Sequence, residues 1–246
     1  MFLGKTRILL INGSPRKYGS TAKLAAIAMK GVKDAGGEPS LVFLYDYRIK
    51  ECIGCVSDDP RICRFPCIIS DDDFNDIGRR VLESDGFIIL SPVYWYNVTG
   101  VLKNFIDRLT SMENMIYHTG RSMLEGKVAG FIAVGNDVGG LHAIAYLMAV
   151  MNSMGVHIPP WALAYSHDKE DVLNDEQAVR DAYNVGYIVA SAARVLREVK
   201  EWYQPVPELS PLRKAALEFI GQYAGEKRKR LELLRALLSS TRSGDS

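Results

Sequence analysis

Side chains that bind anions are gathered in one short stretch near the amino terminus. Ser14, Ser20 and Thr21 carry hydroxyl groups, and Arg16 adds a guanidinium charge among them. Guanidinium and hydroxyl donors are well suited to phosphate oxygens. Gly19 precedes a helical pattern, so the free backbone N–H groups of a helix amino terminus would point at the same place. The stretch therefore predicts a phosphate site.

Two common phosphate loops are excluded by their spacing. A Walker loop needs four residues between its glycines and then a lysine, whereas five residues separate Gly13 from Gly19 and no lysine follows. The G-x-G-x-x-G pattern of dinucleotide-binding folds is absent as well. The alternative to a ligand site is a turn with a helix cap, because Gly, Ser and Pro are ordinary turn residues. The number of anion-binding side chains exceeds what capping requires.

A second candidate segment is aromatic. A planar heteroaromatic ligand fits it, because aromatic and apolar side chains offer faces for stacking and backbone groups can bond to the ring edge. For Trp95 and Tyr96, packing in a subunit interface is an equal alternative, since aromatic residues are enriched there as well. The residues of this segment are Pro92, Val93, Tyr94, Trp95, Tyr96 and Asn97.

A third candidate loop contains glycines. Gly139 and Gly140 would let the backbone approach the other side of such a ring closely. The alternative is a plain strand-to-helix turn, in which the same glycines only relieve backbone strain.

The cysteines form a local group with the spacing C-x2-C-x7-C-x3-C, made by Cys52, Cys55, Cys63 and Cys67. Four thiolates so close together can ligate a [4Fe–4S] cluster or zinc. Disulfides are the main rival, expected inside a cell only in a hyperthermophile or as redox-active bonds. Zinc ranks third, because structural zinc sites usually separate two short cysteine pairs by a longer loop.

A strand–helix alternation must position these segments. Helical patterns begin near residues 20, 71, 100, 141 and 176, and strands are expected at 8–11, 39–45, 86–90, 128–134 and 156–165. The last strand contains Pro159-Pro160 and is expected at an edge. Asp71-Asp72-Asp73 stands at the start of the second helix, where negative charge interacts favourably with the helix dipole, and is interpreted as capping. The alternation predicts an α/β fold with a doubly wound parallel sheet, in which the three candidate loops meet beyond the carboxyl ends of the strands.

Charge and hydropathy exclude several classes of partner. The 246 residues include 30 Lys and Arg against 29 Asp and Glu, a net charge of +1, so no long-range field favours nucleic acid. The longest apolar run is too short to cross a bilayer, and the first strand lacks the layout of a secretory signal. The sequence therefore predicts a cytoplasmic protein with no nucleic-acid or membrane partner.

The chain resembles the NADPH-dependent FMN reductases of the flavodoxin-like fold, a group that includes the iron–sulfur flavoproteins. The resemblance rests on Gly-Ser-Pro-Arg-x-x-Gly-Ser-Thr from Gly13 and on Ser-Pro-Val-Tyr-Trp-Tyr-Asn-Val-Thr-Gly-x-Leu-Lys-Asn-Phe-Ile-Asp-Arg from Ser91. It covers residues 7–160, and the two motifs are specific only as a pair. It implies a five-stranded sheet with the strand order 2-1-3-4-5.

The resemblance also implies FMN as the cofactor. The phosphate would lie at Ser14, Arg16, Gly19, Ser20 and Thr21, the isoalloxazine against Pro92–Asn97, and Gly135, Gly139 and Gly140 would close the site. Lys103, Asp107 and Arg108 also match the family and are interpreted as helix and interface residues. Members are commonly homodimers or homotetramers.

The expected chemistry belongs to the cofactor. A nicotinamide from NADPH or NADH passes hydride to FMN, and a small-molecule or protein acceptor then takes the electrons. No side chain is expected to act as a nucleophile or proton donor. One alternative is an iron–sulfur flavoprotein-type electron carrier for which nicotinamide is not a substrate. A second is a scaffold without enzymatic activity that only oligomerises.

The iron–sulfur flavoproteins carry a compact cysteine motif in the same loop, before an Asp-Asp helix start like that at Asp71. This chain departs from the motif, because Asp58 stands where the third cysteine is usual, and Cys63 is an additional one. A cluster would therefore require Cys63 to bend back toward the other sulfurs.

The resemblance does not cover the carboxyl-terminal part. Prolines at 205, 207 and 211 break the chain, so residues 1–203 are predicted to form the FMN-binding domain and residues 204–246 a helical extension. Helix is predicted over 212–238, with Gly225 as its point of division. We expect this extension to pack on another subunit.

Overall fold

The computed structural model describes residues 4–168, 170–199, 202–203 and 208–242. One parallel sheet is built from β1 (Arg7–Asn12), β2 (Glu38–Phe43), β3 (Gly86–Pro92), β4 (Val128–Val134) and β5 (Leu163–Ser166). Its order, β2-β1-β3-β4-β5, is that of flavodoxin-like sheets. The predicted fold class and strand order are therefore confirmed.

The three central strands are buried on both faces, as their uninterrupted apolar runs require. In β1, Ile8 and Leu10 belong to one core and Leu9 and Ile11 to the other, because successive side chains point to opposite faces. Asn12, the last residue of β1, pairs with Leu90 of β3, which ends shortly afterwards at Pro92. The loops that follow them therefore start side by side.

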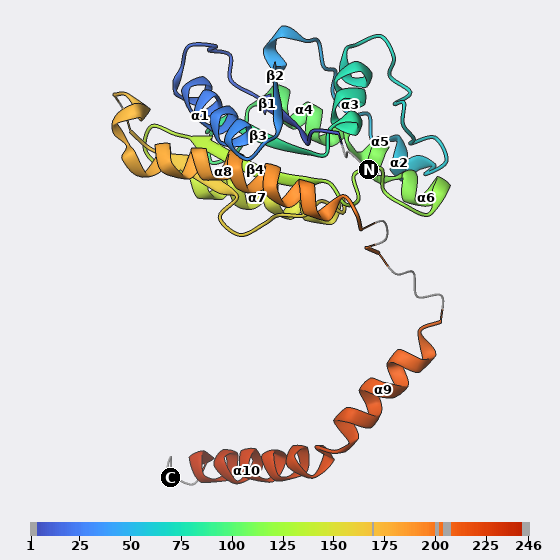
Figure 1. Ribbon diagram of the computed structural model, residues 1–246. Coiled ribbons are helices and arrows are strands. Elements are labelled where there is room, and N and C mark those ends of the chain that lie inside the picture. The colour runs from blue at the N-terminus through green and yellow to red at the C-terminus, as the bar shows by residue number, and fades with distance from the viewer. Residues whose placement is uncertain (1–3, 169, 200–201, 204–207, 243–246) are drawn as a thin grey trace. The chain divides into compact units, whose positions relative to one another are not determined.

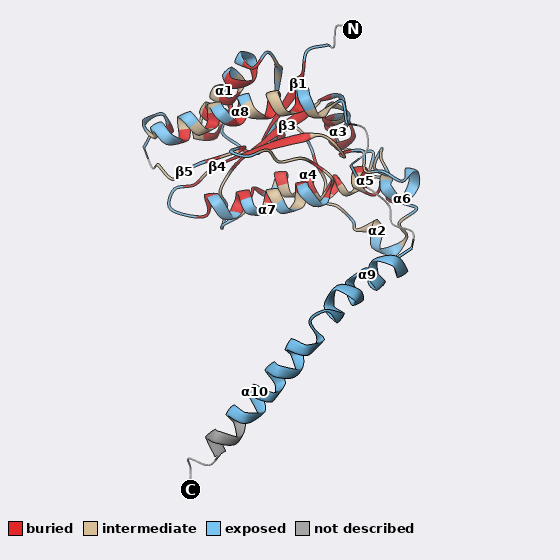
Figure 2. Ribbon diagram, turned by 60° about the horizontal axis from the view of Figure 1, so that its bottom comes forward, coloured by how far each residue is buried: buried red, intermediate tan, exposed pale blue. Residues whose placement is uncertain are grey.

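Helices cover both faces of the sheet (Figures 1 and 2). One layer contains α1 (Ser20–Asp34) and α8 (Glu176–Leu196), and the other contains α3 (Phe74–Glu83), α4 (Gly100–Arg108) and α7 (Gly140–Ser153). The first two touch backbone to backbone, since a Cβ on Gly186 would lie 1.9 Å from the carbonyl oxygen of Ala28. Glycine is required at that position for α1 to pack this closely.

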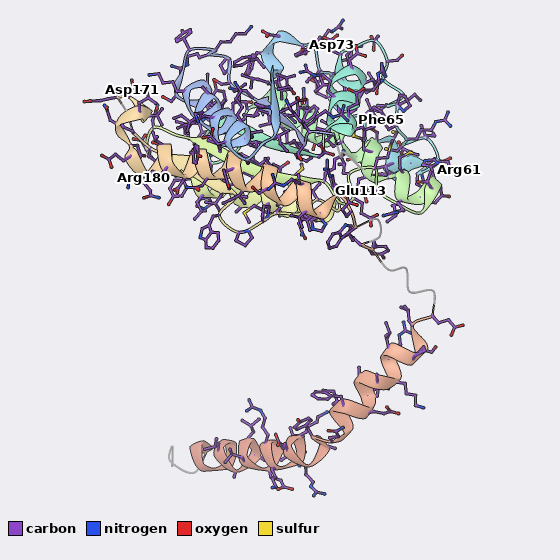
Figure 3. The ribbon with its side chains drawn as sticks, viewed as in Figure 1. Arg61, Phe65, Asp73, Glu113, Asp171 and Arg180 are labelled. Carbon is purple, nitrogen blue, oxygen red and sulfur yellow. The ribbon has the colours of Figure 1, made fainter. Side chains whose placement is uncertain are left out.

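Short elements complete the domain. These are the 3-10 turns η1 (Leu44–Asp46) and η2 (Val172–Asn174) and the helices α2 (Cys55–Asp58), α5 (Thr110–Glu113) and α6 (Met115–Thr119). The segment that carries the cysteines contains α2 and packs on α3, because a Cβ on Gly78 would lie 2.8 Å from the ring of Phe65. Arg61 of this segment and Asp171, beside η2, lie at opposite ends of the domain (Figure 3).

Three predictions about elements need correction. The single helix predicted from Gly100 is two helices, because α4 ends at Arg108 and α5 begins at Thr110. The last strand begins only at Leu163, after the proline pair, although it lies at the predicted edge. In the extension, the helix divides around Gln222, and Gly225 lies inside α10.

The acidic triplet lies at the start of α3, as interpreted, and Asp72 Oδ1 accepts a hydrogen bond of 3.2 Å from the backbone N–H of Phe74, the first residue of the helix. Asp73 is at the N-cap position, but its side chain makes no cap hydrogen bond and instead accepts one from the backbone N–H of Arg48 at 2.7 Å. Asp71 pairs with the ammonium of Lys50, and Asp72 accepts from the backbone N–H of Lys50. The triplet therefore holds the 48–50 segment in place.

The chain divides into two compact units, residues 1–203 and 204–246. The end of the first is held by Glu125, whose carboxylate accepts hydrogen bonds from the backbone N–H groups of Trp202 and Tyr203 at 2.9 and 3.1 Å. The second contains α9 (Ser210–Gly221) and α10 (Ala224–Arg242), whose described side chains are exposed. Across the described ranges, every helix is too short or too polar to cross a bilayer.

Candidate functional site

The predicted phosphate loop lies between β1 and α1 and is held by its own side chains. The buried Asn12 accepts a hydrogen bond at Oδ1 from the backbone N–H of Ser14 at 2.8 Å, and Ser14 Oγ accepts one from the N–H of Arg16 at 3.1 Å. The other amide atom, Asn12 Nδ2, is buried without a hydrogen-bond partner. Gly19 is the N-cap residue of α1 and offers no side-chain cap, so the first turn keeps open N–H groups.

A cavity of about 290 Å³ opens over this loop. All five predicted phosphate-binding residues line it, and Arg16 provides positive charge. The full lining comprises Ser14, Arg16, Tyr18, Gly19, Ser20, Thr21, Lys23, Pro92, Val134, Asn136, Asp168 and Glu170. Open N–H groups at a helix amino terminus and a guanidinium are groups to which an anion can bind, and Asp168 and Glu170 add carboxylates to the same lining.

The aromatic segment after β3 forms a two-residue turn. Tyr94 and Asn97 exchange backbone hydrogen bonds of 2.8 and 3.1 Å, and between them Trp95 and Tyr96 have φ of 48° and 65°. Two positive φ angles define a type I′ turn, which usually takes Asn or Gly at these positions. Bulky residues in this conformation are strained, and such strain clusters at ligand sites. Trp95 is 93% exposed.

The glycine loop packs directly against this turn. Gly139 has φ of 94°, and a Cβ added to it would lie 3.0 Å from Val93 Cγ1 and 3.1 Å from Tyr96 Cα. The backbone N–H of Gly140 points to Nε2 of His167 at 3.1 Å. Gly139 is therefore needed for contact between two protein loops, and neither of these glycines lines a cavity of the site.

A second cavity, of about 510 Å³, lies between the aromatic turn and the glycine loop. Arg16, Pro92, Val134 and Asn136 line both cavities, so the two adjoin and form one cleft. The lining of the larger one comprises Arg16, Pro92, Val93, Tyr94, Trp95, Tyr96, Val134, Gly135, Asn136, Asp137 and Val138. The cleft thus has one end at the start of α1, next to Arg16, and one end lined mainly by apolar and aromatic side chains.

The structure adds residues to the predicted set, and it leaves Asn97, like Gly139 and Gly140, outside the two linings. Asp168 and Glu170 line the phosphate cavity, and sequence reasoning missed them although their position after β5, at the carboxyl edge of the sheet, was a usable signal. Lys23 is also in the lining and pairs with Asp171 at 2.7 Å. Asn97 lies outside both linings and serves the turn, its Oδ1 accepting a hydrogen bond from the N–H of Val98.

The four cysteines surround a separate cavity of only about 10 Å³. All four are free thiols, and Cys63 is buried. Burial, followed by the proximity of Cys55, Cys67 and Cys52, raises the pKa of the Cys63 thiol to about 12. Cys63 therefore does bend back toward the other sulfurs, as a shared site requires.

The four thiols are ligands that an iron–sulfur cluster or a zinc ion can use. Among the described residues, no three His, Cys, Asp or Glu side chains are arranged to hold one metal ion. A zinc ion with Zn–S bonds of about 2.3 Å needs its sulfurs close together, whereas a cluster distributes its four cysteines over separate irons. Four thiols around one cavity fit a cluster chemically, and the cavity must widen to accept it.

Arg108 reaches this cavity from the end of α4. Its side chain is completely buried and forms an ion pair of 2.8 Å with the equally buried Asp72. Burial alone would raise the pKa of Asp72, but hydrogen bonds from Arg108 and from backbone N–H groups outweigh it and keep that pKa below its usual value. The interpretation of Arg108 as an interface residue is therefore wrong, because its guanidinium is buried and pairs with Asp72 inside the domain.

Comparisons with known proteins agree with this architecture. The model of the NADPH-dependent FMN reductase family matches residues 6–170. An iron–sulfur flavoprotein of Archaeoglobus fulgidus is 32% identical over 214 residues, which cover 87% of this chain and 90% of that protein. The putative NAD(P)H-dependent FMN-containing oxidoreductase YwqN of Bacillus subtilis is 28% identical, covering 72% of this chain and 94% of the relative.

Among solved structures, RosB with bound 8-demethyl-8-formylriboflavin-5'-phosphate has the same fold. It superimposes with a TM-score of 0.68 at 20% identity, covering 87% of each chain. The family match spans β1 to β5, including all three loops of the cleft and the cysteine segment. The chain belongs to the NADPH-dependent FMN reductase family of flavin-dependent oxidoreductases.

Proposed function

We propose that this chain is an FMN-dependent oxidoreductase that uses NAD(P)H and passes the electrons to a small-molecule or protein acceptor. The observation that carries the proposal is the two-part cleft, in which an anion-binding loop adjoins an aromatic cavity and Arg16 lines both parts. A mononucleotide has the same two parts, a phosphate and a planar ring. The riboflavin phosphate derivative in RosB and the name of YwqN support the same ligand class.

The residues of the cleft fit FMN on their own chemistry. Arg16, the hydroxyls of Ser14 and Ser20 and the N–H groups at the start of α1 would hold the phosphate. Asn12 Nδ2 is a buried donor still without a partner beneath the same loop. Pro92–Tyr96 would form one wall for the ring and the 135–138 loop another. Bound FMN supplies hydride acceptance from a nicotinamide and transfer of electrons to an acceptor.

The protein's own contribution is to bind and orient the cofactor. The Gly139 contact fixes the aromatic turn against the opposite loop, so the width of the cleft is set by packing. The rings of Tyr94 and Tyr96 line the cavity and are themselves exposed. We assign proton transfer to no side chain.

The experiment is steady-state oxidation of NADPH and of NADH by the full-length protein, with free FMN or a quinone as acceptor. Turnover together with one bound FMN per chain would support the proposal. Protein that neither retains nor binds FMN would overturn it.

A second candidate is an iron–sulfur flavoprotein-type electron carrier, favoured by the four thiols that line one cavity. The Archaeoglobus relative has that name. We propose that Cys52, Cys55, Cys63 and Cys67 ligate a [4Fe–4S] cluster. Anaerobic purification followed by iron and sulfide analysis tests this independently of the flavin. Iron without turnover of either nicotinamide would favour the carrier, and turnover without iron would favour the reductase alone.

A further inference from the structure

Helix α4 starts beside the predicted phosphate loop and ends at a buried arginine that lines the cysteine cavity. Helix α4 starts directly after Thr99, whose hydroxyl donates a 2.8 Å hydrogen bond to the carbonyl of Gly13 in the phosphate loop. It ends at Arg108, the largest of the fully buried side chains. At 1.5 Å per residue, its nine residues span about 13 Å.

The guanidinium of Arg108 is bonded to both sides of the cysteine segment. It donates to the carbonyl oxygens of Lys50, before the first cysteine, and of Ile69, after the last one, at 3.3 and 3.0 Å. It also donates to both carboxylate oxygens of Asp72 at 2.8 and 3.4 Å. These contacts hold the two ends of the cysteine segment together and pair the guanidinium charge with the Asp72 carboxylate.

One further N–H group of Arg108 donates to a cysteine sulfur. Arg108 Nε donates to Cys67 Sγ at 3.2 Å, and Cys67 lines the cavity shared by the four sulfurs. Arginine remains protonated in proteins, so this donor persists at every pH at which the fold does. The guanidinium also lies 4.5 Å above the ring of Phe74, which restrains its plane.

We propose that Arg108 is a positioning residue for the cysteine site that raises the reduction potential of a [4Fe–4S] cluster held there. The inference rests on the cluster named in the second candidate function. On reduction, one electron from the FMN of the proposed function would enter the cluster, and no bond to Arg108 would break. An N–H bond to a ligand sulfur stabilises the more negative reduced form, and it does so strongly where water is excluded. Asp72 offsets the charge of the guanidinium but cannot replace the directed N–H bond.

The test is an anaerobic redox titration of the full-length holoprotein, followed by visible absorbance and electron paramagnetic resonance. The main variant is Arg108→Gln with Asp72→Asn, which removes the bond without leaving an unpaired buried charge. The second is Arg108→Lys, which keeps a cation beside Asp72 but lacks the fixed Nε–H. The matched control is Arg79→Gln with Asp76→Asn, an exposed Arg–Asp pair of 2.7 Å on α3. FMN in the same sample is the internal reference.

We expect a lower cluster potential in both Arg108 variants, with the flavin potential and the control pair unchanged. A cluster potential equal to that of the wild type in both variants would overturn the inference. So would loss of iron from both variants with FMN content and circular dichroism retained, because Arg108 would then have only a structural role. Wild-type protein without iron would remove the cluster and this inference together, and leave flavin binding and nicotinamide turnover to be judged separately.

Discussion

Thr99 and Gly13 join two loops of the cleft through a hydrogen bond of 2.8 Å from the threonine hydroxyl to the glycine carbonyl. Both groups are shut off from water, since Thr99 and Gly13 are buried. A Cβ on Gly13 would lie 3.0 Å from Leu102 Cβ and 3.1 Å from the Thr99 hydroxyl oxygen. The phosphate loop is therefore packed on the start of α4.

Thr99→Val removes this hydroxyl and keeps the shape of the side chain. An unpaired buried carbonyl costs about 1–3 kcal/mol, so we expect a lower free energy of unfolding and weaker FMN binding. Urea unfolding and flavin fluorescence titration measure the two effects. Thr119→Val is the control, because its hydroxyl bonds to Met115 within an exposed turn of α6. Equal FMN affinity in both variants would contradict the coupling of the two loops.

Arg16→Gln tests the phosphate site. Loss of a charge-assisted hydrogen bond costs about 1.5–3 kcal/mol, so FMN affinity should fall by about 10- to 150-fold. Riboflavin lacks the phosphate, and its affinity should not change. Arg180→Gln is the control, since Arg180 pairs with Glu176 on the exposed side of α8. A parallel loss for FMN and riboflavin would mean that Arg16 contacts the ring end of the ligand instead.

Trp95→Asn tests the strain in the aromatic turn. Asn tolerates the left-handed conformation, and a 93% exposed ring contributes little by burial, so the protein should gain about 1 kcal/mol of stability. Trp161→Asn is matched to it, with φ of 59° and 80% exposure outside the cleft, and should give a similar gain. Only Trp95→Asn should raise the KM for a planar acceptor. Destabilisation by Trp95→Asn would show that the turn needs the indole.

The burial of Lys127 leads us to predict that the free energy of unfolding depends on pH. Burial lowers its pKa to about 8 from the usual 10.5, while Asp85 raises it and Arg7 lowers it. Between these two values the unfolded chain binds more protons than the folded one, so this lysine makes stability rise with pH. The rise is about 3 kcal/mol from pH 7 to pH 11. The Nζ donates to the carbonyl oxygens of Leu82 and Ser84 at 2.9 and 2.6 Å, and a neutral amine can keep both bonds.

The measurement is urea unfolding of the wild type and of Lys127→Met at several pH values. The difference in unfolding free energy between them should grow with pH, whereas Lys33→Met, at an exposed position on α1, should give a constant difference. A constant difference for Lys127→Met as well would mean that its ammonium is not penalised by burial.

We expect residues 204–246 to pack on another subunit and so to join chains into a homodimer or homotetramer. On α9, Leu212, Phe219 and Ile220 are 55%, 58% and 64% exposed, an apolar content unusual for a helix without a partner. Light scattering of the full chain and of a version ending at Tyr203 tests this. The shorter version should have a smaller assembly mass with its flavin content unchanged. An unchanged mass would assign the subunit contacts to the first unit.

Much of the fold was predictable because its signals are local. The apolar runs of β3 and β4 identify strands buried on both faces, and the residues that follow β1 and β3 identify the two ends of the cleft. The break between α4 and α5 left no such signal, since the apolar spacing continues through Leu109 and Met112, both buried.

The buried pair of Arg108 and Asp72 was not predictable in the same way. Charged residues at helix ends are usually solvated, and the two are 36 positions apart in the chain. The tertiary fold alone brings them together beside Cys67. Asp168 and Glu170 differ from this pair, because their position after β5 was a usable signal, and they line the cleft since β5 ends next to β4.

The anchoring of Trp202 and Tyr203 by Glu125 has a practical consequence. Glu125 precedes β4 and therefore lies at the amino edge of the sheet, whereas the cleft is at the carboxyl edge. A label attached directly after Tyr203, such as a fluorophore, an affinity label or an electrode linker, would start at the amino edge of the sheet, opposite the cleft. Such a fusion should leave the mouth of the cleft accessible to nucleotides and acceptors, which makes this position the natural junction for biosensor designs.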